Sequence, residues 1–215
     1  MSKACPHFLA YTFLHWLVAV VLTGAGTQVN LIPVENKGVS FLTLIALVVG
    51  LSIQILLPPG IPKYLLFGTV ILLISQMLRP LEEKLEENGL LTEVIVMASG
   101  VFVPMVALGF YDKFNILPWY SYLSISLIGL LLARLILLGL AMTGYYDDKQ
   151  IRTGSKVISS FAIALFALFT TFDINLIRAK AKACKEKNPD YVNASFGIFV
   201  DYLSLFTNFA DVLSD

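Results

Sequence analysis

The sequence predicts an all-α protein, a bundle of seven transmembrane helices that forms a single integral membrane domain over residues 1–215. Composition is the first observation behind this prediction: 57% of the 215 residues are hydrophobic, 14% are charged and the mean hydropathy is +0.79, whereas about a quarter of a soluble domain is charged. The second is that seven apolar runs approach the roughly 20 residues that a helix needs to cross a bilayer. The third is that runs such as "SLIGLLLARLILLGLAM" are apolar on every side, which favours helices over the alternating strands of a β-barrel.

The first four helices are predicted from apolar runs and from the signals around them. The first run is longer than a typical signal-peptide core, so we expect it to remain as a membrane helix. The third is the weakest because prolines precede it, and the segment "RPLEEKLEENGLL" after it reads as a solvated loop or an interfacial stretch. Thr92 is expected to cap the fourth helix, with Glu93 in its first turn. The predicted helices cover residues 8–29, 39–57, 64–78 and 93–111.

The last three helices include one that continues beyond the membrane. The segment "RAKAKACKEK" consists of good helix formers, so the sixth helix is expected to run on to Lys187. Asn188 is expected to cap the seventh helix, with Pro189 at its first position and Asp190 in its first turn. The predicted helices cover residues 119–142, 156–187 and 189–213.

Basic residues predict the orientation of the chain in the membrane. Five of them cluster in the short connection before the last helix, so the positive-inside rule places the N-terminus in the cytoplasm. They are better suited to this role, or to anionic lipid, than to nucleic acid, which we do not expect as a partner. Cys5 and Cys184 would then face a reducing compartment as free thiols. The five residues are Arg178, Lys180, Lys182, Lys185 and Lys187.

Two aspartates, Asp173 and Asp201, lie inside otherwise apolar runs. An ionisable group at membrane depth costs a few kcal/mol and usually marks function. Asp173 lies about 22 Å before Asn188 and Asp201 about 20 Å after it, so an antiparallel helical hairpin brings them level. Thr170 lies one turn before Asp173 on the matching face. A small or polar stripe accompanies Asp201 on the last helix, and it comprises Ala194, Gly197, Ser204 and Asn208.

Two carboxyl groups in contact cannot both ionise cheaply, so the pair is expected to share a proton. The shared proton would tie the two helices together, and ionisation of both groups would loosen them and attract cations. Calcium prefers carboxylate oxygen, although two carboxylates alone make only a weak metal site. The plainer alternative is that Asp173 sits near a helix end and Asp201 is a satisfied buried acid.

Two further ionisable residues lie in predicted spans. Arg134 lies in the middle of "LLARLILL", where a cation must face the bundle, and a structural salt bridge and a gating role are equally open for it. His15 in the first helix could tune a response to pH, although a single histidine in an apolar run is more often hydrogen-bonded and inert.

The strings "FDINLI" and "FGIFVDYLSLFTNF" resemble the C-terminal signature of the Bax-inhibitor family, the transmembrane Bax inhibitor motif proteins. The resemblance implies a seven-helix bundle of Bax-inhibitor type with its last helix near the centre. It also implies a pH-dependent calcium leak, protection against cell death in eukaryotic members, and a functional role for Asp173 and Asp201. The second helix here lacks the arginine that this family often bonds to its acidic pair, and Lys63 or Arg134 could take that place. Whether the last segment crosses the membrane or re-enters stays open.

The expected function is therefore a pH-sensitive, calcium-permeable leak channel or a regulator of calcium homeostasis, anti-apoptotic if the source is eukaryotic or viral. The alternatives are a non-transporting membrane scaffold that regulates cell death and an intramembrane aspartyl protease. The protease is disfavoured because "GIFVD" lacks the G-x-G-D context, so we expect no enzyme and no cofactor besides calcium as the transported or sensed ion. The expected partners are lipid, calcium, protons and other membrane proteins. The expected location is the endoplasmic reticulum or Golgi, or the plasma membrane in a bacterium.

Overall fold

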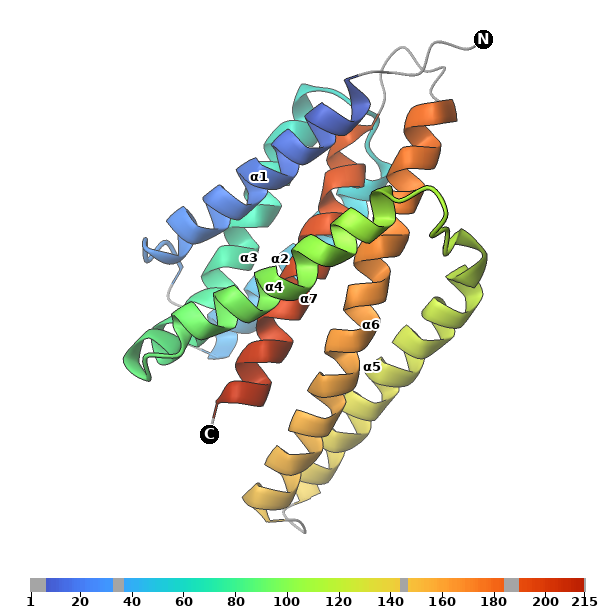
Figure 1. The fold of residues 1–215 in the computed structure, drawn as a ribbon. Helices are drawn as coiled ribbons and strands as arrows, with labels where there is room; N and C mark the ends of the chain where they lie inside the picture. The colour runs from blue at the N-terminus through green and yellow to red at the C-terminus, as the bar shows by residue number, and fades with distance from the viewer. Residues whose placement is uncertain (1–6, 33–36, 144–146, 184–189, 215) are drawn as a thin grey trace. The chain divides into compact units, whose positions relative to one another are not determined.

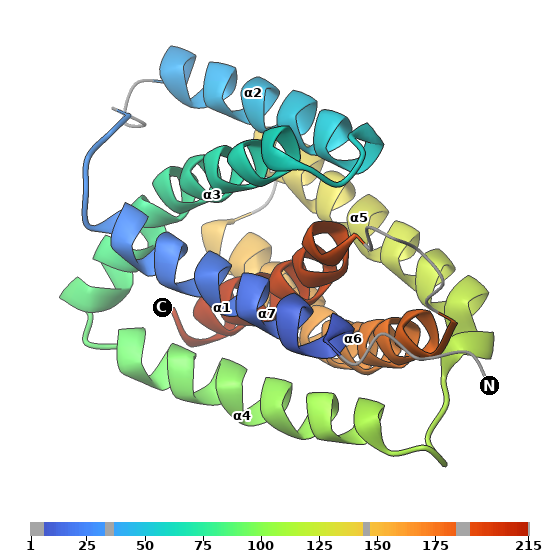
Figure 2. The same cartoon turned by 90° about the horizontal axis from the view of Figure 1, so that it is seen from above.

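The computed structural model describes residues 7–32, 37–143, 147–183 and 190–214, and these residues form α-helices, one short 3-10 helix and no strand. The predicted all-α class is confirmed (Figure 1; seen from above in Figure 2). The α-helices are α1 (Phe8–Thr27), α2 (Lys37–Leu56), α3 (Ile61–Glu87), α4 (Leu91–Phe110), α5 (Tyr120–Thr143), α6 (Asp148–Ala183) and α7 (Tyr191–Leu213), with the 3-10 helix η1 (Leu117–Trp119) before α5.

Six helices in the described part of the chain are long and apolar enough to cross a membrane: α1, α3, α4, α6, α7 and the segment Leu117–Met142 that contains α5. The apolar part of α2, Phe41–Leu56, is shorter. The last helix runs without a break for 23 residues, and this length is sufficient for a full crossing.

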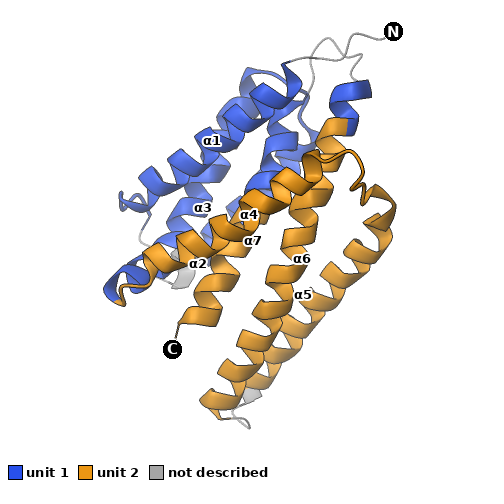
Figure 3. Ribbon diagram, in the orientation of Figure 1, with its two compact units in different colours: residues 1–87, 179–199 blue, residues 88–178, 200–215 orange. Residues whose placement is uncertain are grey.

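The chain forms two compact units (Figure 3). Unit 1 comprises residues 1–87 and 179–199, and unit 2 comprises residues 88–178 and 200–215. Helices α6 and α7 each contribute residues to both units.

Unit 1 is organised around α3, which packs against both α1 and α2 (Figure 2). The side chain of Gln76 on α3 is 1% exposed and closes the C-terminal end of α1. Its amide nitrogen donates to the carbonyl oxygens of Gly26 and Val29, and its amide oxygen accepts from the backbone N–H groups of Leu31 and Ile32. A helix end leaves such backbone groups without partners of its own, so Gln76 supplies in an apolar environment what water would otherwise provide.

The third helix is longer at both ends than the sequence predicted. It begins at Ile61 because Pro62 occupies its first turn, where a missing N–H costs nothing. It also continues through Pro80 to Glu87, so the segment expected to be a loop or an interfacial stretch is part of α3. Leu85 in this extension is fully buried, and Gly89, at a φ of 69°, ends the helical path. Burial of Leu85 offsets part of the local cost of one interior proline.

The boundaries of three later helices also differ. α6 begins at Asp148 rather than at residue 156, and an acid in a first turn favours helix initiation. α4 begins at Leu91, and no side chain caps it, so Thr92 is not its cap. Asp190 caps α7 instead of lying within its first turn, because its Oδ1 accepts from the N–H of Asn193 at 3.1 Å. The predicted end of α6 at Lys187 and the predicted residues Asn188 and Pro189 lie outside the described residues, as do Cys5 and Cys184.

A buried lysine joins three helix ends in unit 1. Lys63, in the first turn of α3, is 0% exposed, and its Nζ lies 2.6 Å from Oδ2 of Asp190. The same Nζ donates to the carbonyl oxygen of Leu57, directly after α2, at 2.9 Å. Asp190 thus uses one oxygen to cap α7 and the other to neutralise Lys63. The ion pair fixes the start of α7 to the connection between α2 and α3.

We expect Asp190→Asn to lower the stability of the protein while leaving the cap of α7 in place, because asparagine is also a good cap. The substitution leaves the charge of Lys63 buried without its partner. The expected loss is roughly 2 kcal/mol, less than for a fully buried pair, because Asp190 is 30% exposed. Thermal unfolding of the purified protein in detergent measures the change.

Glu83→Gln is the matched control, because it breaks the exposed i,i+4 pair between Arg79 and Glu83, which is worth about 0.3–0.5 kcal/mol. The double variant Lys63→Met/Asp190→Asn should regain most of the lost stability, since it removes the unpaired charge. Equal losses in the double variant and in Asp190→Asn would contradict this account of the pair.

Candidate functional site

Asp201 lies on the buried face of α7. Its side chain is 5% exposed, and its Oδ2 is buried without a hydrogen-bond partner among the described residues. This buried face of α7 is formed by residues that are spaced alternately four and three positions apart in the sequence. Of the predicted small or polar stripe, this face keeps Ala194, Asp201 and Asn208, whereas Gly197 and Ser204 are only half-buried. The complete face comprises Ala194, Ile198, Asp201, Leu205 and Asn208.

Asp173 lies on α6, half-buried, in the same unit as Asp201. A hydrogen bond of 2.6 Å from Ser159 to Asp211 sets the local register of the two helices. Counting ten residues along each helix from that bond places Asp201 level with Phe169. Asp173 is then about one turn, or roughly 6 Å, further along α6. By this count Asp173 is offset from Asp201 along the helix axis, whereas the sequence predicted that the two would be level.

The hydroxyl of Thr170 does not extend the acid pair. Thr170 is fully buried, and its Oγ1 donates to the carbonyl oxygen of Phe166, one turn earlier in the same helix, at 2.9 Å. This is the usual way for a threonine to satisfy itself inside a helix. Thr170 thus contributes a small, closely packed position beside Asp173 and no hydrogen bond to it.

Polar side chains around Asp173 hold this part of α6 against the end of α4. Nδ2 of Asn175 donates to the carbonyl oxygen of Gly109 at 2.8 Å, and its Oδ1 accepts from the N–H of Ile116 at 2.9 Å. Arg178 donates to the same Gly109 carbonyl at 2.8 Å and pairs with Asp112. A Cβ at Gly109 would lie 2.6 Å from the Cβ of Ile174, so the two helices meet where only glycine fits. The sequence reading missed Asn175, whose signal is an amide two residues after the intramembrane acid.

Arg134 is bound to α6 and α7 by a polar network within unit 2. Its Nη2 donates to the Oδ1 of Asn208, and at 3.3 Å to the Oγ of Ser159. Ser159 in turn donates to Oδ2 of Asp211, which also accepts from Ser155 at 2.7 Å. Ser159 is fully buried and thus links the guanidinium to a carboxylate through one hydroxyl. Ser155, Ser159 and Asp211 were not predicted, although Asp211 follows Asn208 by three residues on the same helical face.

The other two predicted supporting residues, Lys63 and His15, belong to unit 1. Lys63 is committed to Asp190 and to the Leu57 carbonyl, as described above. The ring of His15 stacks on Tyr64 and Tyr191, with centroids at 5.3 and 6.3 Å, and its Nδ1 lies 2.6 Å from the carbonyl oxygen of Tyr11. A carbonyl only accepts, so Nδ1 carries the hydrogen in this contact.

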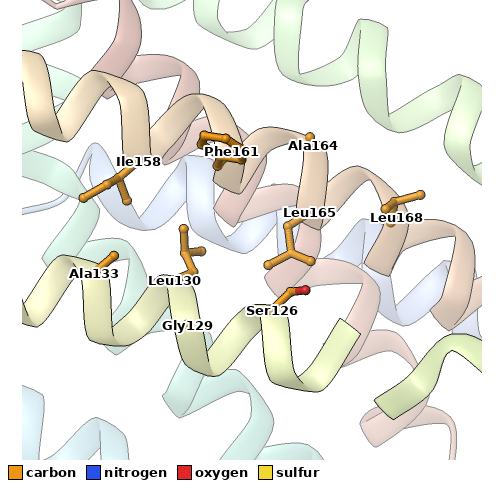
Figure 4. A pocket seen from close by; sticks show the side chains of 9 residues that line it. All are labelled: Ser126, Gly129, Leu130, Ala133, Ile158, Phe161, Ala164, Leu165 and Leu168. Atoms are coloured by element: carbon orange, nitrogen blue, oxygen red, sulfur yellow. The ribbon is translucent and has the colours of Figure 1, made fainter. Parts of the chain in front are cut away.

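A polar cavity of about 770 Å³ lies beside the Arg134 network in unit 2. A separate apolar cavity of about 390 Å³ lies between α5 and α6, and Figure 4 shows its lining side chains, which include Phe161, Leu165 and Leu168. Ile158 lines both cavities. No carboxylate lines the apolar one. The polar cavity is lined by Arg134, Leu137, Leu138, Ala141, Asp147, Asp148, Ile151, Arg152, Ser155, Ile158 and Asp211.

The described residues contain no group of three or more histidine, cysteine, aspartate or glutamate side chains that could hold a metal ion. Calcium usually takes six to eight oxygen ligands.

Asp201→Asn is expected to raise the melting temperature at pH 8, because it replaces a buried ionisable group that lacks a full set of partners. The gain should shrink at pH 5, where the wild-type carboxyl can take up a proton and no longer carries a charge. Melting curves of wild type and variant in detergent at both pH values test this expectation.

Asp211→Asn is the comparison variant on the same helix, because Oδ2 of Asp211 accepts hydrogen bonds from both Ser155 and Ser159. It should lower stability by roughly 1 kcal/mol at pH 8. The account of Asp201 is wrong if Asp201→Asn loses as much stability as Asp211→Asn.

Comparison with known proteins identifies the family. The family model described as "Inhibitor of apoptosis-promoting Bax1" matches residues 5–215, and no curated protein sequence matches the chain. The match and the six apolar helices together make this a multi-pass integral membrane protein. Since the match covers nearly the whole sequence, the chain belongs to the Bax inhibitor family.

Proposed function

We propose that this protein is a pH-sensitive, calcium-permeable leak pathway, or a regulator of calcium homeostasis acting through such a leak, with Asp173 and Asp201 as its latch. The observation that carries the proposal is the buried Asp201, whose Oδ2 has no hydrogen-bond partner among the described residues. A carboxyl group in this position is costly unless it gains a proton or a cation.

The latch has two states that differ in charge. When the acids share one proton, a hydrogen bond between carboxyls holds α6 and α7 together. When both are ionised, they repel, and a divalent cation is the counter-charge that relieves the repulsion. Two residues after Asp173, Asn175 binds the end of α4, so α6 is held in place next to the latch.

The family match supports a role in regulating cell death, which we propose for a eukaryotic or viral source at the endoplasmic reticulum or Golgi. A bacterial source would place the protein in the plasma membrane. A scaffold that binds membrane partners without transport is the second candidate, and the same family description favours it. We propose no enzymatic activity, because the sequence around Asp201 lacks the context of an intramembrane aspartyl protease.

Calcium flux into proteoliposomes over a pH series tests the proposal. Wild type is expected to show a flux that depends on pH. Asp173→Asn and Asp201→Asn should each change the flux roughly tenfold, the effect of about 1.4 kcal/mol, and remove most of its pH dependence, because an amide cannot share the proton.

Glu93→Gln is the matched control, since Glu93 is an exposed acid in the first turn of α4, and its flux should equal that of wild type. Unchanged flux in both aspartate variants rules out the latch. Absence of flux at every pH favours the scaffold, and cleavage of a model transmembrane peptide favours the protease.

A further inference from the structure

The polar cavity in unit 2 extends inward from the C-terminal end of α5 and the N-terminal end of α6. Asp147, Asp148 and Arg152 are exposed at its outer part. Arg134 lies nine residues before the end of α5, and Ser155 lies seven residues after the start of α6. At 1.5 Å per residue, the cavity reaches roughly 10–14 Å along the two helices. Arg134 is itself exposed, so water that enters this cavity can reach the guanidinium.

The inner end of this cavity meets the Arg134 network. Both Arg134 and Asp211 line the cavity, and Asn208, which binds Arg134, is 3% exposed. Asp201 lies seven residues, or about 10 Å, from Asn208 toward the N-terminal end of α7. Ser204 lies between them and is half-buried. The polar residues of α7 thus continue from the cavity past Arg134 to the acid whose oxygen lacks a partner.

We propose that the polar cavity is the vestibule through which hydrated cations approach the acid pair, and that the bond between Arg134 and Asn208 is its gate. This inference rests on the proposed function, because it names the route and the regulation of the same site. Under the orientation predicted from the basic residues, the vestibule opens on the side opposite the cytoplasm.

The charge of Arg134 explains why its position matters for permeation. A guanidinium remains protonated at any physiological pH, so the gate is a permanent positive charge between the vestibule and the acids. Coulomb repulsion is twice as large for a divalent cation as for a monovalent one. While Arg134 is bound to Asn208, the passage is closed by both its volume and its charge.

The structure also contains a second acceptor for Arg134. Ser159 accepts from Arg134 and donates to Asp211, so a carboxylate lies one hydroxyl away from the guanidinium. A shift of Arg134 from Asn208 to Asp211 would exchange an amide acceptor for a charged one. That exchange moves the guanidinium away from the path along α7 and keeps its positive charge paired.

Cysteine accessibility in proteoliposomes tests the vestibule and the gate. In a Cys5→Ser/Cys184→Ser background, Ile151→Cys places a thiol on the cavity wall, and Ser204→Cys places one beyond Arg134. A membrane-impermeant cationic methanethiosulfonate reagent should modify Ile151→Cys from one side of the membrane only, and Ser204→Cys roughly tenfold more slowly. Adding Arg134→Gln should bring Ser204→Cys close to the rate of Ile151→Cys.

Two controls separate the gate from a general loss of structure. Arg152→Gln removes a cation from the cavity mouth and should leave Ser204→Cys slow. Asn208→Ala breaks the gate bond from the other side and should mimic Arg134→Gln, which keeps the test valid if Arg134→Gln does not fold. The vestibule is refuted if the reagent does not modify Ile151→Cys. The gate is refuted if Ser204→Cys still reacts slowly in Arg134→Gln and Asn208→Ala variants whose melting temperatures show that they are folded. The bond between Arg134 and Asn208 would then have only a structural role.

Calcium flux distinguishes this inference from the proposed function. Arg134→Gln should raise the flux roughly tenfold and leave Asp173 and Asp201 in place. Wild-type protein without flux at any pH would refute the proposed function, whatever the accessibility results. A pH-dependent flux that both aspartate variants abolish, together with slow Ser204→Cys in every variant, would refute the gate alone.

Discussion

A polar group inside an apolar helix bundle must find its partner within the protein, because lipid offers none. Gln76, Lys63, Asn175 and Arg134 meet this requirement, each with a partner on another element. Asp201 departs from it, since one oxygen is buried without a partner among the described residues. Buried oxygens of Thr12 and Gln54 also lack a hydrogen-bond partner among the described residues. Of these groups, only the carboxyl of Asp201 can relieve this state by taking up a proton or a cation, which fits a residue kept for function.

Several helix ends are completed by side chains from later helices. Gln76 of α3 closes the C-terminal end of α1, Lys63 of α3 binds the carbonyl after α2, and Asn175 and Arg178 of α6 bind the last turn of α4. Cations at helix C-termini also interact favourably with the helix dipole. These contacts satisfy carbonyl groups that cannot reach water, and they fix which helix ends meet within each unit.

The acid pair and the Arg134 network lie at different positions along α7 and are held by different numbers of bonds. Asp211 and Asn208 are tied to α5 and α6 by several bonds, whereas Asp201, two turns and more away, is held by few. The other end of α7 is held as well, by the ion pair between Asp190 and Lys63, so Asp201 lies on the stretch between two anchored ends. In the proposed mechanism, a change of protonation at Asp201 acts on this stretch, and the anchors at both ends of α7 keep the bundle folded.

Composition and local periodicity determined the fold class, the approximate position of all seven helices and the two intramembrane acids, because lipid imposes long apolar runs that are visible in the sequence. Long-range packing decided the rest. The burial of Leu85 extended α3 through Pro80, Asp190 rather than the acid pair became the partner of Lys63, and Ser159 and Asp211 joined Arg134. A side chain's partner depends on which helix faces meet, and no local pattern in the chain encodes that choice.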